Sequence, residues 1–130
     1  LISNGTGIAP FLGMIHENTK CIKTHLFWGG RNKSSYNLYR DLVTKAIQNK
    51  QLKSVNIAYS RESTEKKYVQ HLIEENPRMI ERVLSQNGVI MICGSIVMES
   101  DVKEVLDSIT VSKLNSKLSK FSNQIKSDCY

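Results

Sequence analysis

The chain has 130 residues, of which 40% are hydrophobic and 23% are charged, a composition typical of one soluble globular domain rather than a disordered or fibrous chain. Lysine and arginine number 18 and aspartate and glutamate 12, so the net charge of +6 favours anionic partners without identifying one. The longest apolar run, 89–93, is far shorter than the ~20 residues of a membrane helix, no secretion signal is visible, and the three cysteines have neither disulfide-framework nor zinc-site spacing.

Short apolar runs alternate along the chain with longer segments of helical period. The expected strands are 1–2, 24–28, 55–59, 89–93 and 125–129, and the expected helices are 8–16, 35–50, 68–75, 77–86, 97–109 and 112–122. This order predicts an α/β domain, an open doubly wound parallel sheet of about five strands with helices on both faces. In such sheets ligands bind at the carboxyl ends of the strands, so the residues there are the candidates for a site.

The segment 4–10 (NGTGIAP) follows the first strand. Gly5 and Gly7 allow a tight turn and a close approach to a ligand, and the helix that follows offers free N–H groups to a phosphate. Thr6 adds a hydroxyl, while Pro10 stands where the dinucleotide-binding fingerprint has its third glycine. We interpret the segment as a phosphate-binding loop, although a strand-to-helix turn without a ligand would also need glycine.

Basic residues follow the second and third strands. Arg31 stands near the position where an NAD site has a ribose-binding acid. Ser60, Arg61 and Lys66 follow the third strand, and their hydroxyl, guanidinium and ammonium groups suit a phosphate monoester. Tyr68 offers a ring for stacking on a base. Each residue alone would be an ordinary surface residue, but together at strand ends they favour binding.

The fourth strand ends at Cys93, followed by Gly94 and Ser95. Gly94 permits close approach of a ligand, and the thiol of Cys93 would face the cleft, although a cysteine that ends an apolar strand is most often a buried structural residue. The final residue, Tyr130, is an aromatic in a position that usually frays. The three histidines share no partner, and we expect no metal site.

Six segments resemble, in this order, the NADPH-binding half of ferredoxin–NADP reductase-type flavoproteins, and most closely the diflavin reductase branch. They are 5–11 (GTGIAPF), 26–31 (LFWGGR), 59–62 (YSRE), 67–71 (KYVQH), 92–95 (ICGS) with Met98, and 128–130 (DCY). The resemblance implies that 1–130 form a ferredoxin reductase-like C-terminal NADP-binding domain. It also implies that the chain is a fragment of a longer flavoprotein, whose FAD-binding barrel precedes the first strand, which is cut short here.

The resemblance further implies roles for individual residues. The 5–10 loop with Thr6, helped by Arg31, would hold the pyrophosphate of the nucleotide. Residues matching those that grip the 2′-phosphate and adenine imply NADPH rather than NADH, and they are Ser60, Arg61, Lys66 and Tyr68. Three further residues complete the expected cofactor-binding set, namely Gln70, Gly94 and Ser95. Cys93 and Asp128 would lie beside the nicotinamide, and Tyr130 would shield the flavin ring.

The implied activity is hydride transfer from NADPH to FAD, with electrons passed on to a further acceptor, while the isolated fragment would be inactive. The expected partners are the FAD-binding domain of the same parent chain and an FMN domain, a sulfite reductase haemoprotein or another haem protein. The expected location is cytoplasmic, including the cytoplasmic side of a membrane-tethered parent. A noncatalytic NADP(H)-binding or interaction module is the alternative. Nucleic-acid binding is supported only by the net charge.

Overall fold

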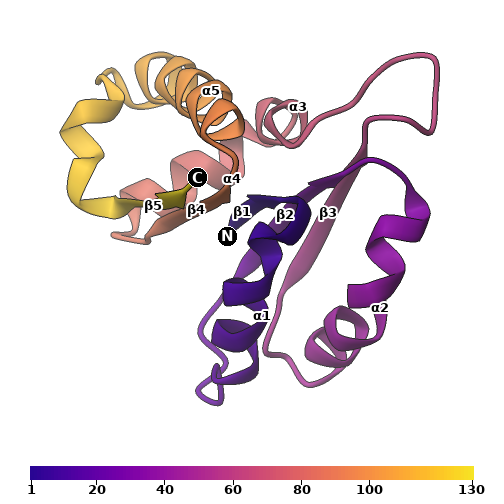
Figure 1. The fold of residues 1–130 in the computed structure, drawn as a ribbon. Helices are drawn as coiled ribbons and strands as arrows, with labels where there is room; N and C mark the ends of the chain where they lie inside the picture. The colour runs from indigo at the N-terminus through magenta and orange to yellow at the C-terminus, as the bar shows by residue number, and fades with distance from the viewer.

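Five parallel strands form one sheet in the computed structural model, which describes all of residues 1–130 (Figure 1). The strands are β1 (Ile2–Asn4), β2 (His25–Gly30), β3 (Ser54–Tyr59), β4 (Ile90–Gly94) and β5 (Ile125–Cys129). They lie in the order β3-β2-β1-β4-β5, and every neighbouring pair is parallel. The predicted open, doubly wound parallel sheet is therefore confirmed.

Helices cover both faces of this sheet. They are α1 (Ala9–His16), α2 (Lys33–Gln48), α3 (Val69–Glu74), α4 (Pro77–Ser85) and α5 (Ile96–Leu114), with 3₁₀ helices η1 (Gly5–Ile8) and η2 (Leu118–Gln124). The apolar residues of α1 and α2 pack on one face, and those of α3, α4 and α5 pack on the other. None of these helices combines the length and the apolarity needed to span a bilayer.

Two apolar clusters arise from the alternation of side chains along each strand. Phe27 and Ile92 face α3, α4 and α5, whereas their chain neighbours Trp28 and Cys93 face α1 and α2. On the central strand, Ser3 is fully buried and its hydroxyl has no hydrogen-bond partner. The core is thus divided into two layers by the sheet, and the sheet holds the loops at its carboxyl edge in fixed positions.

The expected helix over 112–122 is wrong. Residues up to Leu114 are instead the last turns of α5, which ends at Asn115 in the left-handed conformation (φ 52°). Asparagine tolerates this conformation and commonly ends helices. The side chain of Asp107 then accepts a hydrogen bond of 2.8 Å from the N–H of Leu118, which fixes the start of η2 after the break.

The chain leaves the central strand in two directions. It runs from β1 to β2 and β3 on one side, and then crosses back to β4 and β5 on the other. Loops that follow β1 and β4 therefore diverge at the carboxyl edge, and such a change of direction is where ligands bind in open α/β sheets.

Candidate functional site

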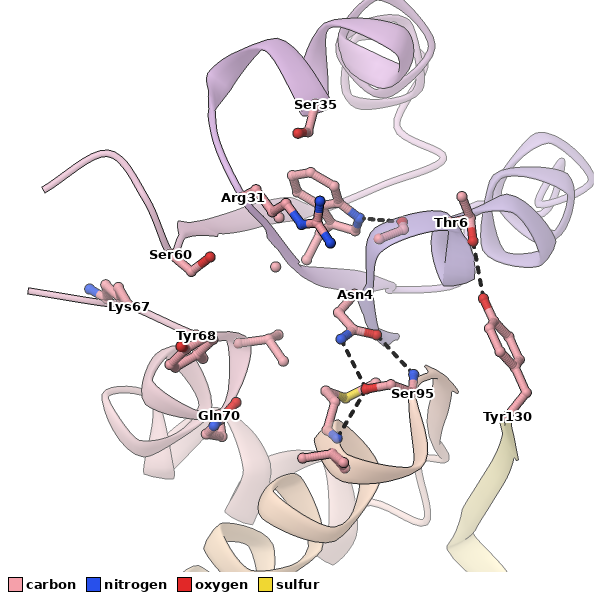
Figure 2. Close-up of a pocket in the computed structure, with 17 residues that line it drawn as sticks. Asn4, Thr6, Arg31, Ser35, Ser60, Lys67, Tyr68, Gln70, Ser95 and Tyr130 are labelled. Carbon is pink, nitrogen blue, oxygen red and sulfur yellow. Dashed lines mark hydrogen bonds between the residues drawn. The ribbon is translucent and has the colours of Figure 1, made fainter.

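A cleft of about 590 Å³ opens at the carboxyl edge of the sheet, within the range of small-molecule and cofactor sites (Figure 2). Its 17 lining residues lie at or beyond the carboxyl ends of β1, β2, β3 and β4, or come from the start of α3 and the final residue, Tyr130. The only charged side chains among them are Arg31 and Lys67. Both lie on the side of the cleft formed by β2 and β3, so the opposite side, called the uncharged side below, has no charged side chain.

The structure brings together many of the residues that the sequence pointed to. The predicted residues that line the cleft are Gly5, Thr6, Arg31, Ser60, Tyr68, Gln70, Ser95 and Tyr130. The predicted residues outside its lining are Gly7, Pro10, Arg61, Lys66, Cys93, Gly94 and Asp128. Lining residues that were not predicted are Asn4, Trp28, Gly29, Gly30, Ser35, Lys67, Val69, Val97 and Met98.

The turn after β1 contains two glycines, and each position requires glycine for a different reason. Gly5 has a φ of +53°, and the Trp28 indole N–H donates a hydrogen bond of 2.9 Å to its carbonyl oxygen. Gly7 is buried against the backbone of Cys93 and Gly94, where a Cβ would collide with the Cys93 carbonyl oxygen. The first glycine permits the turn, and the second lets η1 lie directly against the end of β4.

Asn4 links the ends of β1 and β4 across the change of direction. Its Oδ1 accepts a hydrogen bond of 3.0 Å from the N–H of Ser95, and its Nδ2 donates to Ser95 Oγ at 3.2 Å. Ser95 Oγ also accepts from the N–H of Met98 and caps α5. Gly94 has a φ of +150°, and a Cβ there would collide with Asn4 Oδ1. No local sequence pattern indicates this link, because the partners are 91 residues apart.

Two arginines lie on neighbouring chain segments beyond β2 and β3. The ladder between these strands continues past their ends, since Ser60 N–H donates to Gly30 O and Arg61 N–H donates to Arg31 O at 2.8 Å. Both arginines are exposed, and neither belongs to the two ion pairs of the chain, Lys67–Glu75 and Lys103–Glu99. This edge of the cleft therefore carries guanidinium groups with no carboxylate partner.

The start of α3 borders the same edge. Tyr68 is 41% exposed, and its ring centroid lies 5.7 Å from that of His71. Lys67 pairs with Glu75 at 2.8 Å, and Gln70 donates a hydrogen bond to Asp101 of α5 at 3.1 Å. Lys66 is exposed outside the lining. An aromatic face is thus open to a ligand here, whereas the nearest lysine is already paired.

Cys93 is buried on the face covered by α1 and α2, and is 5% exposed. Burial raises the pKa of its thiol, and the negative charge of Asp128, its partner in the β4–β5 register, raises that pKa further. The thiol therefore stays protonated at neutral pH. No group of three histidine, cysteine, aspartate or glutamate side chains is placed to hold a metal ion.

We expect an alkylating reagent at neutral pH to modify the exposed Cys21 at least ~10-fold faster than Cys93, because thiolate character and access control the rate. Raising the pH should continue to speed Cys93 modification up to its elevated pKa. Mass spectrometry of the labelled peptides measures both rates, and labelling in urea is the control that should equalise access. Equal rates in the folded chain would contradict the burial of Cys93.

Tyr130 is held in place at the mouth of the cleft. Its N–H donates to Gly94 O at 3.0 Å, and its carbonyl oxygen accepts from the N–H of Ile96. The phenol oxygen lies 3.1 Å from Thr6 Oγ1, so the ring bridges to the loop after β1 (Figure 2). The side chain is nevertheless 69% exposed. The ring can therefore move without breaking the backbone contacts that hold this residue.

Residues 1–104 match the family model described as "Oxidoreductase NAD-binding domain". The NADPH–cytochrome P450 reductase of Musca domestica is 36% identical over 124 residues, which cover 88% of this chain and 18% of that protein. The enzyme of the same name from Aspergillus oryzae is 32% identical over 136 residues, covering 97% and 19%. The nitric oxide synthase of Bombyx mori is 36% identical over 122 residues, covering 84% and 10%. The chain thus spans about a fifth or less of these relatives.

Proposed function

The chain belongs to the oxidoreductase NAD-binding domain family, and we propose that it is the NADPH-binding module of a flavoprotein oxidoreductase. The observation that carries this proposal is the division of the cleft. Unpaired guanidinium groups lie beside one side, and an uncharged surface with an exposed tyrosine forms the other. NADPH has the same polarity, since its 2′-phosphate carries nearly two charges and its nicotinamide ring is uncharged.

The charged side of the cleft would hold the phosphates and adenine. Arg31 and Arg61 offer planar, forked donors for phosphate oxygens, and Ser60, which lines the cleft, adds a hydroxyl. The exposed ring of Tyr68 is placed for stacking on adenine. Arg31 in place of an acid favours NADPH over NADH, because an acid would accept from the ribose hydroxyl of NADH and repel the phosphate of NADPH.

The uncharged side would hold the nicotinamide, and bound NADPH would supply the hydride. We assign Cys93, Asp128 and Tyr130 to this end. Burial keeps the Cys93 thiol protonated, so its role is that of a neutral packing or hydrogen-bonding group, not of a nucleophile. FAD would be held mainly by a domain outside this chain, to which Tyr130 would contribute an aromatic face.

Because the chain spans about a fifth or less of its relatives, its partners are also proposals. We propose that an FAD-binding domain of the same parent chain accepts the hydride. An FMN domain or a haem protein would then take the electrons in single steps. The name NADPH–cytochrome P450 reductase supports a cytochrome, which is a haem protein, as the acceptor.

Calorimetric titration of the parent flavoprotein with NADP⁺, NAD⁺ and 2′,5′-ADP tests the nucleotide preference. We expect NADP⁺ to bind at least ~10-fold more tightly than NAD⁺, because charge-assisted contacts to the extra phosphate contribute about 1.5–3 kcal/mol. We also expect 2′,5′-ADP to compete with NADP⁺. A preference for NAD⁺ would contradict the proposal. Binding of NADPH without flavin reduction in stopped flow would instead support the noncatalytic module.

Replacing Tyr130 with alanine should reduce the preference for NADPH over NADH. The ring and its contact with Thr6 occupy the mouth of the cleft, and the nicotinamide has to displace them. With its further phosphate contacts, NADPH stays bound long enough for the ring to move, whereas NADH dissociates first. Removing the ring should therefore help NADH more, by about tenfold. Steady-state kcat/KM for both nucleotides measures this. The control Tyr130→Phe removes only the hydroxyl contact, and an unchanged cofactor preference in the alanine variant would contradict the role.

A further inference from the structure

The hydrogen bonds around Ser95 leave one of its atoms without a partner. Ser95 N–H donates to Asn4 Oδ1, which fixes the orientation of the Asn4 amide, so Asn4 Nδ2 must be the group that faces Ser95 Oγ. The N–H of Met98 is the second donor to that oxygen. A serine hydroxyl accepts two hydrogen bonds and donates one. Both acceptor positions of Ser95 are therefore filled, and its own proton has no acceptor within the chain.

This proton lies in the uncharged part of the cleft. Ser95 lines the cleft together with Asn4, Val97, Met98 and Tyr130, while the lining cations, Arg31 and Lys67, are on the opposite side (Figure 2). A neutral donor among apolar and amide groups suits a neutral carbonyl oxygen better than a phosphate, which the guanidinium groups would hold. Asn4 and Met98 prevent the hydroxyl from turning into an acceptor, so the site distinguishes a carbonyl oxygen from an amino group.

We propose that Ser95 donates a hydrogen bond to the carboxamide oxygen of the nicotinamide, and that Asn4 is the positioning residue that keeps it a donor. The inference rests on the proposed function, because it places the nicotinamide in this cleft. It goes beyond that function by naming the contact that sets the orientation of the ring. A nicotinamide held by its carboxamide oxygen cannot turn over, so the same face of the ring is always directed toward Tyr130, where the flavin is expected.

The test compares NADP⁺ with 2′-phospho-ADP-ribose, which lacks the nicotinamide, by titration of the parent flavoprotein. The titrations use a Tyr130→Ala background, because the Tyr130 ring borders this part of the cleft. We expect Ser95→Ala to weaken NADP⁺ binding about three- to tenfold, the effect of one neutral hydrogen bond, and to leave 2′-phospho-ADP-ribose binding unchanged. Ser95→Thr keeps the hydroxyl and should restore most of the affinity. Ser122→Ala, an exposed serine on η2, is the matched control.

Asn4→Asp gives a sharper test, because it leaves Ser95 in place. The carboxylate can still accept from Ser95 N–H, but its second oxygen would accept the Ser95 proton instead of donating to Ser95 Oγ. We expect this variant to reduce the ratio of NADP⁺ affinity to 2′-phospho-ADP-ribose affinity as Ser95→Ala does. The added negative charge repels both ligands and therefore cancels in this ratio, whereas loss of the Ser95 contact lowers only the affinity for NADP⁺.

Three outcomes would overturn the inference while leaving the proposed function intact. The first is no effect of Ser95→Ala on the binding of either ligand, and the second is an equal loss of affinity for both ligands. The third is a ratio of NADP⁺ affinity to 2′-phospho-ADP-ribose affinity in Asn4→Asp that equals the ratio in the Tyr130→Ala background. Failure of the background protein to bind 2′-phospho-ADP-ribose would instead overturn the proposed function. Because Ser95→Ala also removes the cap of α5, the thermal midpoint is measured for each variant, and a loss caused by the cap alone should weaken both ligands equally.

Discussion

Replacing Arg61 with alanine is expected to weaken NADPH binding about 10- to 100-fold and to change NADH binding by no more than about twofold. The Arg61 side chain is exposed and has no carboxylate partner, and the Arg61 backbone lies beside that of Arg31 because the β2–β3 ladder continues to Arg61 N–H. Removing it takes away a charge-assisted contact that only the 2′-phosphate of NADPH can use. NADH has only a neutral 2′-hydroxyl at that position, so its binding should depend little on Arg61.

Isothermal titration of the parent flavoprotein with both nucleotides measures the two affinities. The control is Arg78→Ala, which removes the same charge from α4, outside the cleft. A loss with the control as large as with Arg61→Ala would mean that net charge, and not a local contact, attracts the nucleotide. Equal losses for NADPH and NADH in Arg61→Ala would contradict the assignment of the 2′-phosphate to this edge.

The strands could be predicted because each carries a local signal. The apolar run at 89–93 and the Gly29-Gly30 end of the second strand each mark an element without reference to the rest of the chain. The α/β alternation then leaves few topologies, and the match to the family model over residues 1–104 confirms the resemblance. Helix ends were harder to predict, because Asn115 stops α5 through a left-handed conformation that the sequence permits but does not require.

From local patterns, the site could be predicted where its residues follow the end of a strand. Thr6, Arg31 and Ser60 each follow a strand directly, so the sheet brings them to one edge. The link between Asn4 and Ser95 depends on the register of β1 against β4, and no local pattern encodes it. Lys66 and Lys67 are adjacent in sequence, and only the structure shows that Lys67 lines the cleft and that it is paired with Glu75.

Among the substitutions considered, we expect the largest loss of stability where η1 contacts β4, at Gly7. Alanine at Gly7 would place a Cβ against the Cys93 carbonyl oxygen, 2.7 Å from the Cys93 carbonyl carbon and 2.8 Å from Gly94 Cα. These are backbone atoms of a central strand, so no side chain can rotate to make room. We expect Gly7→Ala to lower the free energy of unfolding by about 2–4 kcal/mol, as overpacking against a rigid neighbour does.

Two other glycines separate this steric effect from backbone conformation. Gly5 has a φ of +53° and open space around its Cβ position, so Gly5→Ala should cost only the strain of a left-handed residue, about 1–2 kcal/mol. Gly13 lies inside α1 with nothing within 4 Å, and Gly13→Ala should raise the free energy of unfolding by about 0.5–1 kcal/mol. Urea denaturation of the purified chain measures all three. Of these three glycines, only Gly7 has backbone atoms in the space of its missing side chain. If Gly7→Ala proved no more destabilising than Gly5→Ala, the loop after β1 could not be held against β4 as the structure places it.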